Sequence, residues 1–255
     1  YICSGVIIWE KTERGNQRMT VLVIGGVAAG TKAAAKLKRL DRSADVRILT
    51  MSKDISYAGC GLPYYVGDLI HDRSELVVNT PEKYAALTGA QVETEVEVTK
   101  LNREVKTVTA VDHKTGEERT YDYDKLIIAT GASPIVPPVA GIHLKNIFVM
   151  RTPDDAAAIR EAVDAGEIKR AVVAGAGFIG LEVAENLHAR GVRTTVIDMA
   201  PQIMTPFDPE MAEYAENHLA DEGIMCFTGT SLEGVLGADK VEKVQTSRKA
   251  YRRMP

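Results

Sequence analysis

Cysteine is scarce in this chain of 255 residues, which has only Cys3, Cys60 and Cys226. No two of them are close enough to form a C-x-x-C redox pair, a zinc cluster or a disulfide framework. A chemical role for Cys60 would therefore need a partner thiol, persulfide or oxidant from outside the chain. The low cysteine content also favours a reducing, cytoplasmic setting.

Other features that mark common protein classes are also missing. No apolar run approaches the roughly 20 residues that a membrane-spanning helix needs. The net charge of −4 gives no polybasic surface for nucleic acid or an anionic membrane. The five histidines are scattered without metal-ligand spacing, so we expect no metal site. Aromatic residues make up only 5%, and the abundance of alanine and valine favours α/β layers.

Cys60 lies between Gly59 and Gly61 in a stretch rich in small residues. A single cysteine is most often a small apolar residue of the core, and that interpretation stays open here. The flanking glycines favour the alternative, because they would let another molecule approach the sulfur closely. We also expect a short helix to begin at Gly61.

A first strand–turn–helix–strand unit precedes the cysteine. The apolar run 20–24 predicts a buried strand, residues 25–30 a glycine-rich turn, 31–40 an alanine-rich helix and 45–50 a second strand. Such a turn lets a pyrophosphate reach backbone N–H groups at the helix start. Val27 replaces the middle glycine of G-x-G-x-x-G, and Thr50 replaces the usual ribose-binding acid, so a plain tight turn stays possible. The helix also carries a basic face of Lys32, Lys36 and Arg39, which is either a solvated surface or a site for substrate phosphates.

A second unit of the same kind follows residue 170. The strand 171–174 leads into the complete G-x-G-x-x-G motif of residues 175–180, a helix over 181–190 and a strand over 192–197. Asp198 then ends that strand at the spacing expected of an acid that binds a ribose 2′-OH. An acid there would repel a 2′-phosphate, and no arginine follows, so the motif favours NADH over NADPH.

These units predict an α/β protein with two Rossmann-like, three-layer nucleotide-binding domains and an inserted antiparallel β-meander. We expect the meander in the alternating segments 92–98 and 105–111 and in the segment 113–118, which holds a Thr115-Gly116 turn, and a domain boundary near the proline cluster 134–138. The predicted organisation is an N-terminal extension over 1–18, an incomplete FAD-binding domain over 19–150 and a truncated NADH-binding domain over 151–255. Met19 is the expected natural start.

Four segments together resemble the single-cysteine pyridine nucleotide–disulfide oxidoreductases, and especially their coenzyme A disulfide reductase, persulfide reductase and NADH oxidase branch. The resemblance runs from about residue 19 to 249. The segments that carry it are Gly25-Gly26-Val27-Ala28-Ala29-Gly30, Ser56-Tyr57-Ala58-Gly59-Cys60-Gly61-Leu62-Pro63-Tyr64, Tyr123-Asp124-Lys125-Leu126-Ile127-Ile128-Ala129-Thr130-Gly131-Ala132 and Gly175 to Glu182.

The resemblance implies roles for particular residues. Cys60 would be the redox cysteine, receiving electrons that pass from NADH through FAD. Phe178 would be an aromatic gate over the flavin, and Glu182 would sit near the nicotinamide. FAD would contact Gly25, Gly26, Val27, Ala28, Ala29, Gly30, Thr50, Met51, Val98, Thr130 and Gly131; NADH would contact Gly175, Gly177, Phe178, Ile179, Gly180, Glu182 and Asp198; Lys32, Lys36, Arg39 and Ser56 match the region that binds coenzyme A.

The electron acceptor stays open among several classes. The leading expectation is a low-molecular-weight disulfide or persulfide, and the runner-up is oxygen or peroxide with a Cys60 sulfenic acid. Gly59 departs from the asparagine often found beside the cysteine in coenzyme A disulfide reductases, which keeps persulfide and oxygen as acceptors. The family continues beyond this chain with a second FAD-binding segment and a dimerisation domain, so we expect a homodimer of the full-length form. An inactive nucleotide-binding fragment is the third alternative for the chain itself.

Overall fold

The computed structural model describes residues 18–248, which divide into two compact units. Unit 1 contains residues 18–58 and 77–133, and unit 2 contains residues 59–76 and 134–248. The expected N-terminal extension, except for Arg18, lies outside the described residues. The predicted boundary at residue 150 differs from this division, because the chain changes units at Ser133. Residues 59–76, which include Cys60, also belong to unit 2 rather than to the unit expected to bind FAD.

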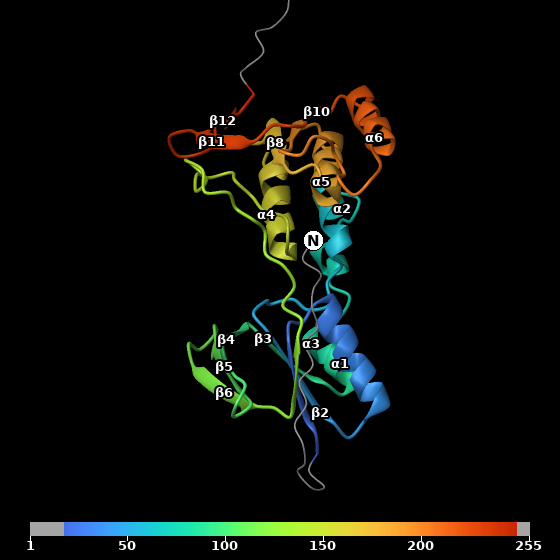
Figure 1. Cartoon of the computed structure of the whole chain (residues 1–255), viewed down its shortest axis with the longest axis vertical. Helices are drawn as coiled ribbons and strands as arrows, with labels where there is room; N and C mark the ends of the chain where they lie inside the picture. The colour runs from blue at the N-terminus through green and yellow to red at the C-terminus, as the bar shows by residue number, and fades with distance from the viewer. Residues whose placement is uncertain (1–17, 249–255) are drawn as a thin grey trace, which may run out of the picture. The chain divides into compact units, whose positions relative to one another are not determined.

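Unit 1 is built on a four-stranded parallel sheet with the strand order β3-β2-β1-β7. The strands are β1 (Thr20–Ile24), β2 (Asp45–Thr50), β3 (Gln91–Thr94) and β7 (Lys125–Ile128). Helices α1 (Ala28–Leu40) and α3 (Pro81–Thr88) connect strands of this sheet (Figure 1). The central strand β1 is apolar on both faces, as expected of a parallel strand covered on both sides, whereas the edge strand β3 is mostly polar.

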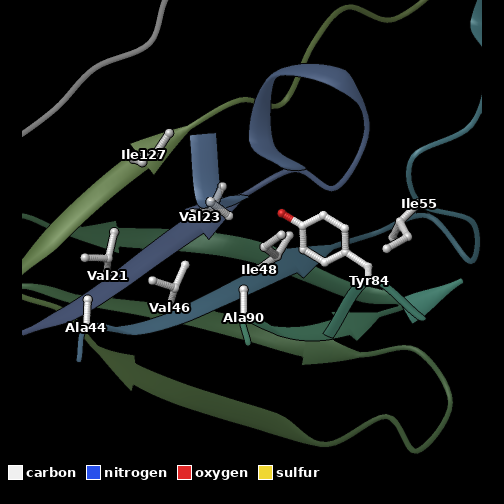
Figure 2. Close-up of a cluster of buried hydrophobic side chains, with 10 residues drawn as sticks. Val21, Val23, Ala44, Val46, Ile48, Ile55, Tyr84, Ala90 and Ile127 are labelled. Carbon is white, nitrogen blue, oxygen red and sulfur yellow. The ribbon is translucent and has the colours of Figure 1, made fainter. Parts of the chain in front are cut away.

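Alternate residues of β1 and β2 serve the two faces of this sheet. Val21, Val23, Val46 and Ile48 belong to one buried cluster, in which Tyr84 of α3 also packs (Figure 2). Leu22 and Leu49 belong to another, shared with the three-stranded antiparallel sheet β4 (Val96–Asn102), β5 (Thr107–Asp112) and β6 (Glu118–Asp122). Unit 1 therefore has the expected three layers.

The predicted meander is present, but its strands differ from the expectation. Residues 91–94 form β3 of the parallel sheet, so the first meander strand begins only at Val96. The chain changes sheets at Glu95, which has a left-handed φ of 61°. Alternation of apolar and polar residues continues across this point, so it could not show that one run serves two sheets.

Unit 2 contains a second parallel sheet, with the order β10-β9-β8. Its strands are β8 (Arg170–Ala174), β9 (Arg193–Ile197) and β10 (Met225–Phe227), linked by α5 (Phe178–Ala189) and α6 (Pro209–Asp221). Helix α4 (Pro153–Asp164) precedes the sheet, and the hairpin of β11 (Leu232–Leu236) and β12 (Lys243–Thr246) follows it. The fold class predicted from the sequence, two Rossmann-like units with an inserted meander, is confirmed.

Each unit joins its first strand to its helix through the same backbone contact. Gly25 and Gly175 adopt φ values of 108° and 116°, a region that L side chains rarely adopt. A Cβ built on Gly30 would lie 1.9 Å from the Gly25 carbonyl oxygen, and one on Gly180 would lie 1.9 Å from the Gly175 carbonyl oxygen. The outer glycines of the motif are therefore required by the fold itself.

This contact predicts different effects for two glycines of the second turn. Gly180→Ala should lower the free energy of unfolding by about 2–3 kcal/mol, because the new methyl group meets backbone that cannot move aside. Gly177→Ala should change it by less than about 1 kcal/mol, because a Cβ there would have no neighbour within 4 Å. Urea unfolding of the two variants checks this, and equal stabilities would contradict it.

Candidate functional site

The N-terminal ends of α1 and α5 are open in the same way. Neither helix has a side-chain N-cap hydrogen bond or an acidic residue in its first turn. By contrast, α3 is capped by Thr80 and α4 by a capping box of Thr152 and Asp155. The first N–H groups of a helix lack internal partners and carry partial positive charge. These two helix ends are therefore suited to a phosphate group, and they fit the pyrophosphates of two dinucleotides.

In unit 1 the predicted FAD-contacting residues gather around the first glycine turn. A Cβ built on Gly25 would lie 2.1 Å from the Ala129 carbonyl oxygen, so the end of β7 brings Thr130 beside the turn. A Cβ on Gly26 would lie 3.0 Å from the Thr50 methyl group, and the Ser56 N–H donates to the Gly26 carbonyl oxygen at 2.9 Å. Three chain segments thus meet at this turn.

The other unit 1 residues that we predicted to contact FAD or substrate differ in how far they are exposed. Met51, Ala28, Ala29, Thr130 and Gly131 are exposed, and Val98 packs against the meander-side core from β4. Lys32, Lys36 and Arg39 are exposed along α1, as the basic face predicted, whereas the intervening Lys38 is buried with its Nζ on the carbonyl oxygens of Arg42 and Ala44. The structure brings none of these three exposed basic residues into a described contact with the turn.

In unit 2 the predicted acid braces the second glycine turn. The N–H of Ala176 donates to Asp198 Oδ2 at 2.6 Å, and the N–H of Ala200 donates to Oδ1 at 2.7 Å. Asp198 therefore lies at the turn, beside the position where a ribose would follow a pyrophosphate. Its carboxylate also has a structural role, since both oxygens already accept backbone hydrogen bonds.

The first turn of α5 presents large apolar side chains to solvent. Phe178 and Ile179 are 51% and 60% exposed, and the half-buried Glu182 follows one turn later. The Phe178 ring meets the edge of Phe207, with ring centroids 5.6 Å apart. Exposed apolar groups at an open helix end fit a flat, aromatic ligand group better than they fit water. Phe207 was not anticipated from the sequence, because it meets Phe178 only after folding.

Cys60 is exposed and lies in a 3₁₀ turn, Gly59–Gly61, that runs directly into α2 (Leu62–Val66). The short helix expected to begin at Gly61 is thus present, one residue later. Buried Leu62 and Val66 on α2 pack against α4 and α5. The exposure of the thiol contradicts the alternative that Cys60 is a buried apolar residue.

The other described cysteine, Cys226, is half-buried in β10. Burial, with a smaller contribution from the charge of Glu216, raises the pKa of the Cys226 thiol to about 11.

No group of three or more His, Cys, Asp or Glu residues within 18–248 has the arrangement of a metal site. No helix in the same range is long and apolar enough to cross a membrane.

Comparison with known proteins agrees with this geometry. Residues 19–254 match the pyridine nucleotide-disulphide oxidoreductase family model. The chain belongs to this family. Membership confirms the family that the sequence resembles, and it agrees with the FAD and pyridine-nucleotide cofactors predicted from the sequence.

Individual relatives carry different names. An NADH oxidase of Methanocaldococcus jannaschii is 35% identical over 91% of this chain and 52% of the relative. A coenzyme A disulfide reductase of Staphylococcus haemolyticus is 36% identical over 75% of this chain and 43% of the relative. The structure of an NAD-dependent persulfide reductase from A. fulgidus is 38% identical, with a TM-score of 0.85 over 90% of this chain and 43% of that one. The chain spans about half the length of the curated relatives it matches.

The two described cysteines should differ sharply toward an alkylating reagent. At pH 8 iodoacetamide should label Cys60 and leave Cys226 largely unmodified, because Cys226 stays a neutral thiol until the pH approaches its raised pKa of about 11. Peptide mass spectrometry of the folded chain measures both sites, and labelling in denaturant, where both should react, is the control. Equal labelling of the folded protein would contradict the described exposures.

Proposed function

We propose that the protein containing this chain is an FAD-dependent oxidoreductase that uses NADH to reduce a low-molecular-weight disulfide or persulfide through Cys60. The observation that supports this most directly is the combination of two open, glycine-framed helix ends with a cysteine, Cys60, that is the exposed one of the two within residues 18–248. FAD, when bound, would supply the conversion of a hydride from NADH into electrons for sulfur. The chain's own residues would bind, orient and exchange protons.

The first glycine turn and Thr130 would hold FAD, and the second turn and Asp198 would hold NADH. Asp198 would accept from a ribose hydroxyl while repelling a 2′-phosphate, which favours NADH over NADPH. Phe178 would be an aromatic gate over the flavin, and Glu182 would sit near the nicotinamide. Lys32, Lys36, Arg39 and Ser56 would receive an anionic substrate such as coenzyme A disulfide.

The proposed reaction at sulfur needs one thiol from the enzyme, that of Cys60. The Cys60 thiolate attacks one sulfur of the substrate disulfide, forms a mixed disulfide and releases the first thiolate. Two electrons from NADH then cleave the mixed disulfide, which releases the second thiolate and restores Cys60. Each disulfide consumes one NADH and one proton and yields two thiols, and a persulfide would yield one thiol and hydrogen sulfide in the same way.

A second candidate is an NADH oxidase or peroxidase, which the Methanocaldococcus relative favours. There Cys60 would pass through a sulfenic acid in place of a mixed disulfide. A nucleotide-binding fragment without activity is a third, because the chain covers about half of its relatives. The cytoplasmic setting and the homodimer of the longer protein stay predictions.

An acceptor screen with a Cys60→Ser variant tests the proposal. In anaerobic assays with FAD, the wild-type sequence in its longer natural protein should oxidise NADH only when a disulfide or persulfide is added, and Cys60→Ser should lose at least about 1,000-fold of that rate. Flavin absorbance shows that the variant still binds the cofactor. NADH oxidation that requires oxygen or peroxide would favour the oxidase, and absence of flavin binding by the 255-residue chain on its own would favour the inactive fragment.

Asp198→Ala should lower NADH affinity and also destabilise unit 2 by about 1–3 kcal/mol, because the N–H groups of Ala176 and Ala200 lose a charged acceptor. NADH titration and thermal unfolding measure the two effects separately. Asp221→Ala on exposed α6 is the matched control. Unchanged stability of the Asp198 variant would contradict the described hydrogen bonds.

A further inference from the structure

The C-terminal end of α2 is held by arginines from two other helices of unit 2. Arg160 of α4 donates through Nη1 to the carbonyl oxygens of Tyr65 at 2.9 Å and Ile70 at 2.8 Å. Arg190, the residue that ends α5, donates through Nη1 to the Val66 carbonyl oxygen at 3.1 Å. Carbonyl groups at the end of a helix lack partners within the helix. The arginines supply donors to Tyr65 and Val66 at the end of α2, in addition to the Asp68 N–H on Tyr65, and Arg160 also binds the following loop at Ile70.

Arg160 is the centre of this arrangement. Its side chain is only 15% exposed, its guanidinium lies 4.6 Å from the ring centroid of Tyr65, and Nη2 pairs with Asp68. Asp164 lies 3.6 Å from Arg160 Nε and 2.5 Å from Arg190 Nη2, so one carboxylate joins both arginines. A planar guanidinium can serve two carbonyls, a carboxylate and a ring together, which an ammonium group cannot do.

The apolar side of α2 is fixed to the same two helices. Leu62 and Val66 pack with Ile159 and Val163 of α4 and with α5. A Cβ on Gly67 would lie 1.9 Å from Asn186 Oδ1, so the chain passes α5 as closely as a glycine permits. A helix of five residues is not stable on its own in water. Its form therefore depends on these contacts with α4 and α5.

We propose that Arg160 is a positioning residue for Cys60: by holding the C-terminal end of α2, it fixes the turn at the other end that carries the thiol. The cysteine is thereby held on the same compact unit as the second glycine turn. Arg190 and Asp164 support Arg160 in this role. That the positioned thiol takes part in electron transfer rests on the proposed function. That Arg160 positions the thiol does not.

The test uses a nitroxide attached to Cys60 as a mixed disulfide. A methanethiosulfonate spin label is applied at pH 7 to the 255-residue chain carrying Cys3→Ser, where the raised pKa of Cys226 keeps that thiol neutral. Peptide mass spectrometry confirms the labelled site. Electron paramagnetic resonance reports the label's motion, and amide hydrogen exchange reports the opening of residues 61–70.

Arg160→Met should give a more mobile label and roughly tenfold faster exchange in residues 61–70, while exchange in β8 and β9 stays unchanged. Arg160→Lys should give an intermediate result, because the charge remains but the paired carbonyl contacts are lost. Asp164→Asn, which leaves those carbonyl contacts in place, should shift the label less than Arg160→Met. Arg170→Met, at an exposed arginine of β8, is the matched control and should behave as the unmodified sequence.

Unchanged label mobility in the lysine and asparagine variants would overturn the proposal, even if Arg160→Met fails to fold. Exchange that increases equally throughout unit 2 would also overturn it, because Arg160 would then be a general stabiliser. In the longer natural protein, Arg160→Lys should lower kcat for the disulfide with little change in KM for NADH. The spectroscopic and exchange measurements need neither FAD nor NADH. If the proposed function fails, they still test whether Arg160 positions Cys60.

Discussion

A single backbone contact underlies both nucleotide-type units: the Cα of the last motif glycine lies against the carbonyl oxygen of the first. In each unit a side chain at Gly30 or Gly180 would collide with that oxygen at 1.9 Å. The contact lets the helix begin immediately after the strand. As a result, the free N–H groups of the first turn stand at the carboxyl edge of the parallel sheet, where ligands of such sheets bind.

The same constraint explains why Val27 is tolerated where a glycine was expected. Val27 precedes α1 with a φ of −99°, outside the left-handed region that favours glycine. At the equivalent Gly177 a Cβ would also meet nothing. Packing requires the outer glycines of each motif and not the middle one. The residue at the middle position instead affects how closely a ligand can approach the turn. The difference between the two turns is therefore one of ligand approach rather than of folding.

Much of the fold follows from local sequence, because its main elements are short runs with one strong pattern. The buried strands, both glycine turns and the position of Asp198 could be predicted in this way. The double use of residues 91–102 could not, since one alternating pattern feeds two sheets that meet at Glu95. Helix α3 was also missed, although Thr80 and Pro81 form a recognisable start, because its apolar face contributes little beyond Tyr84.

The least predictable part of the candidate site is the support of the cysteine. Arg160 follows three alanines and an isoleucine in α4, and a charged residue on such a helix is usually solvated. Its partners lie about 90 residues earlier, and only folding brings them together. Because residues 59–76 pack with unit 2, the thiol is held by the unit whose glycine motif is complete, not by the unit that precedes it in sequence. In the sequence, the cysteine lies between the two glycine turns. In the structure, it shares one compact unit with the second turn.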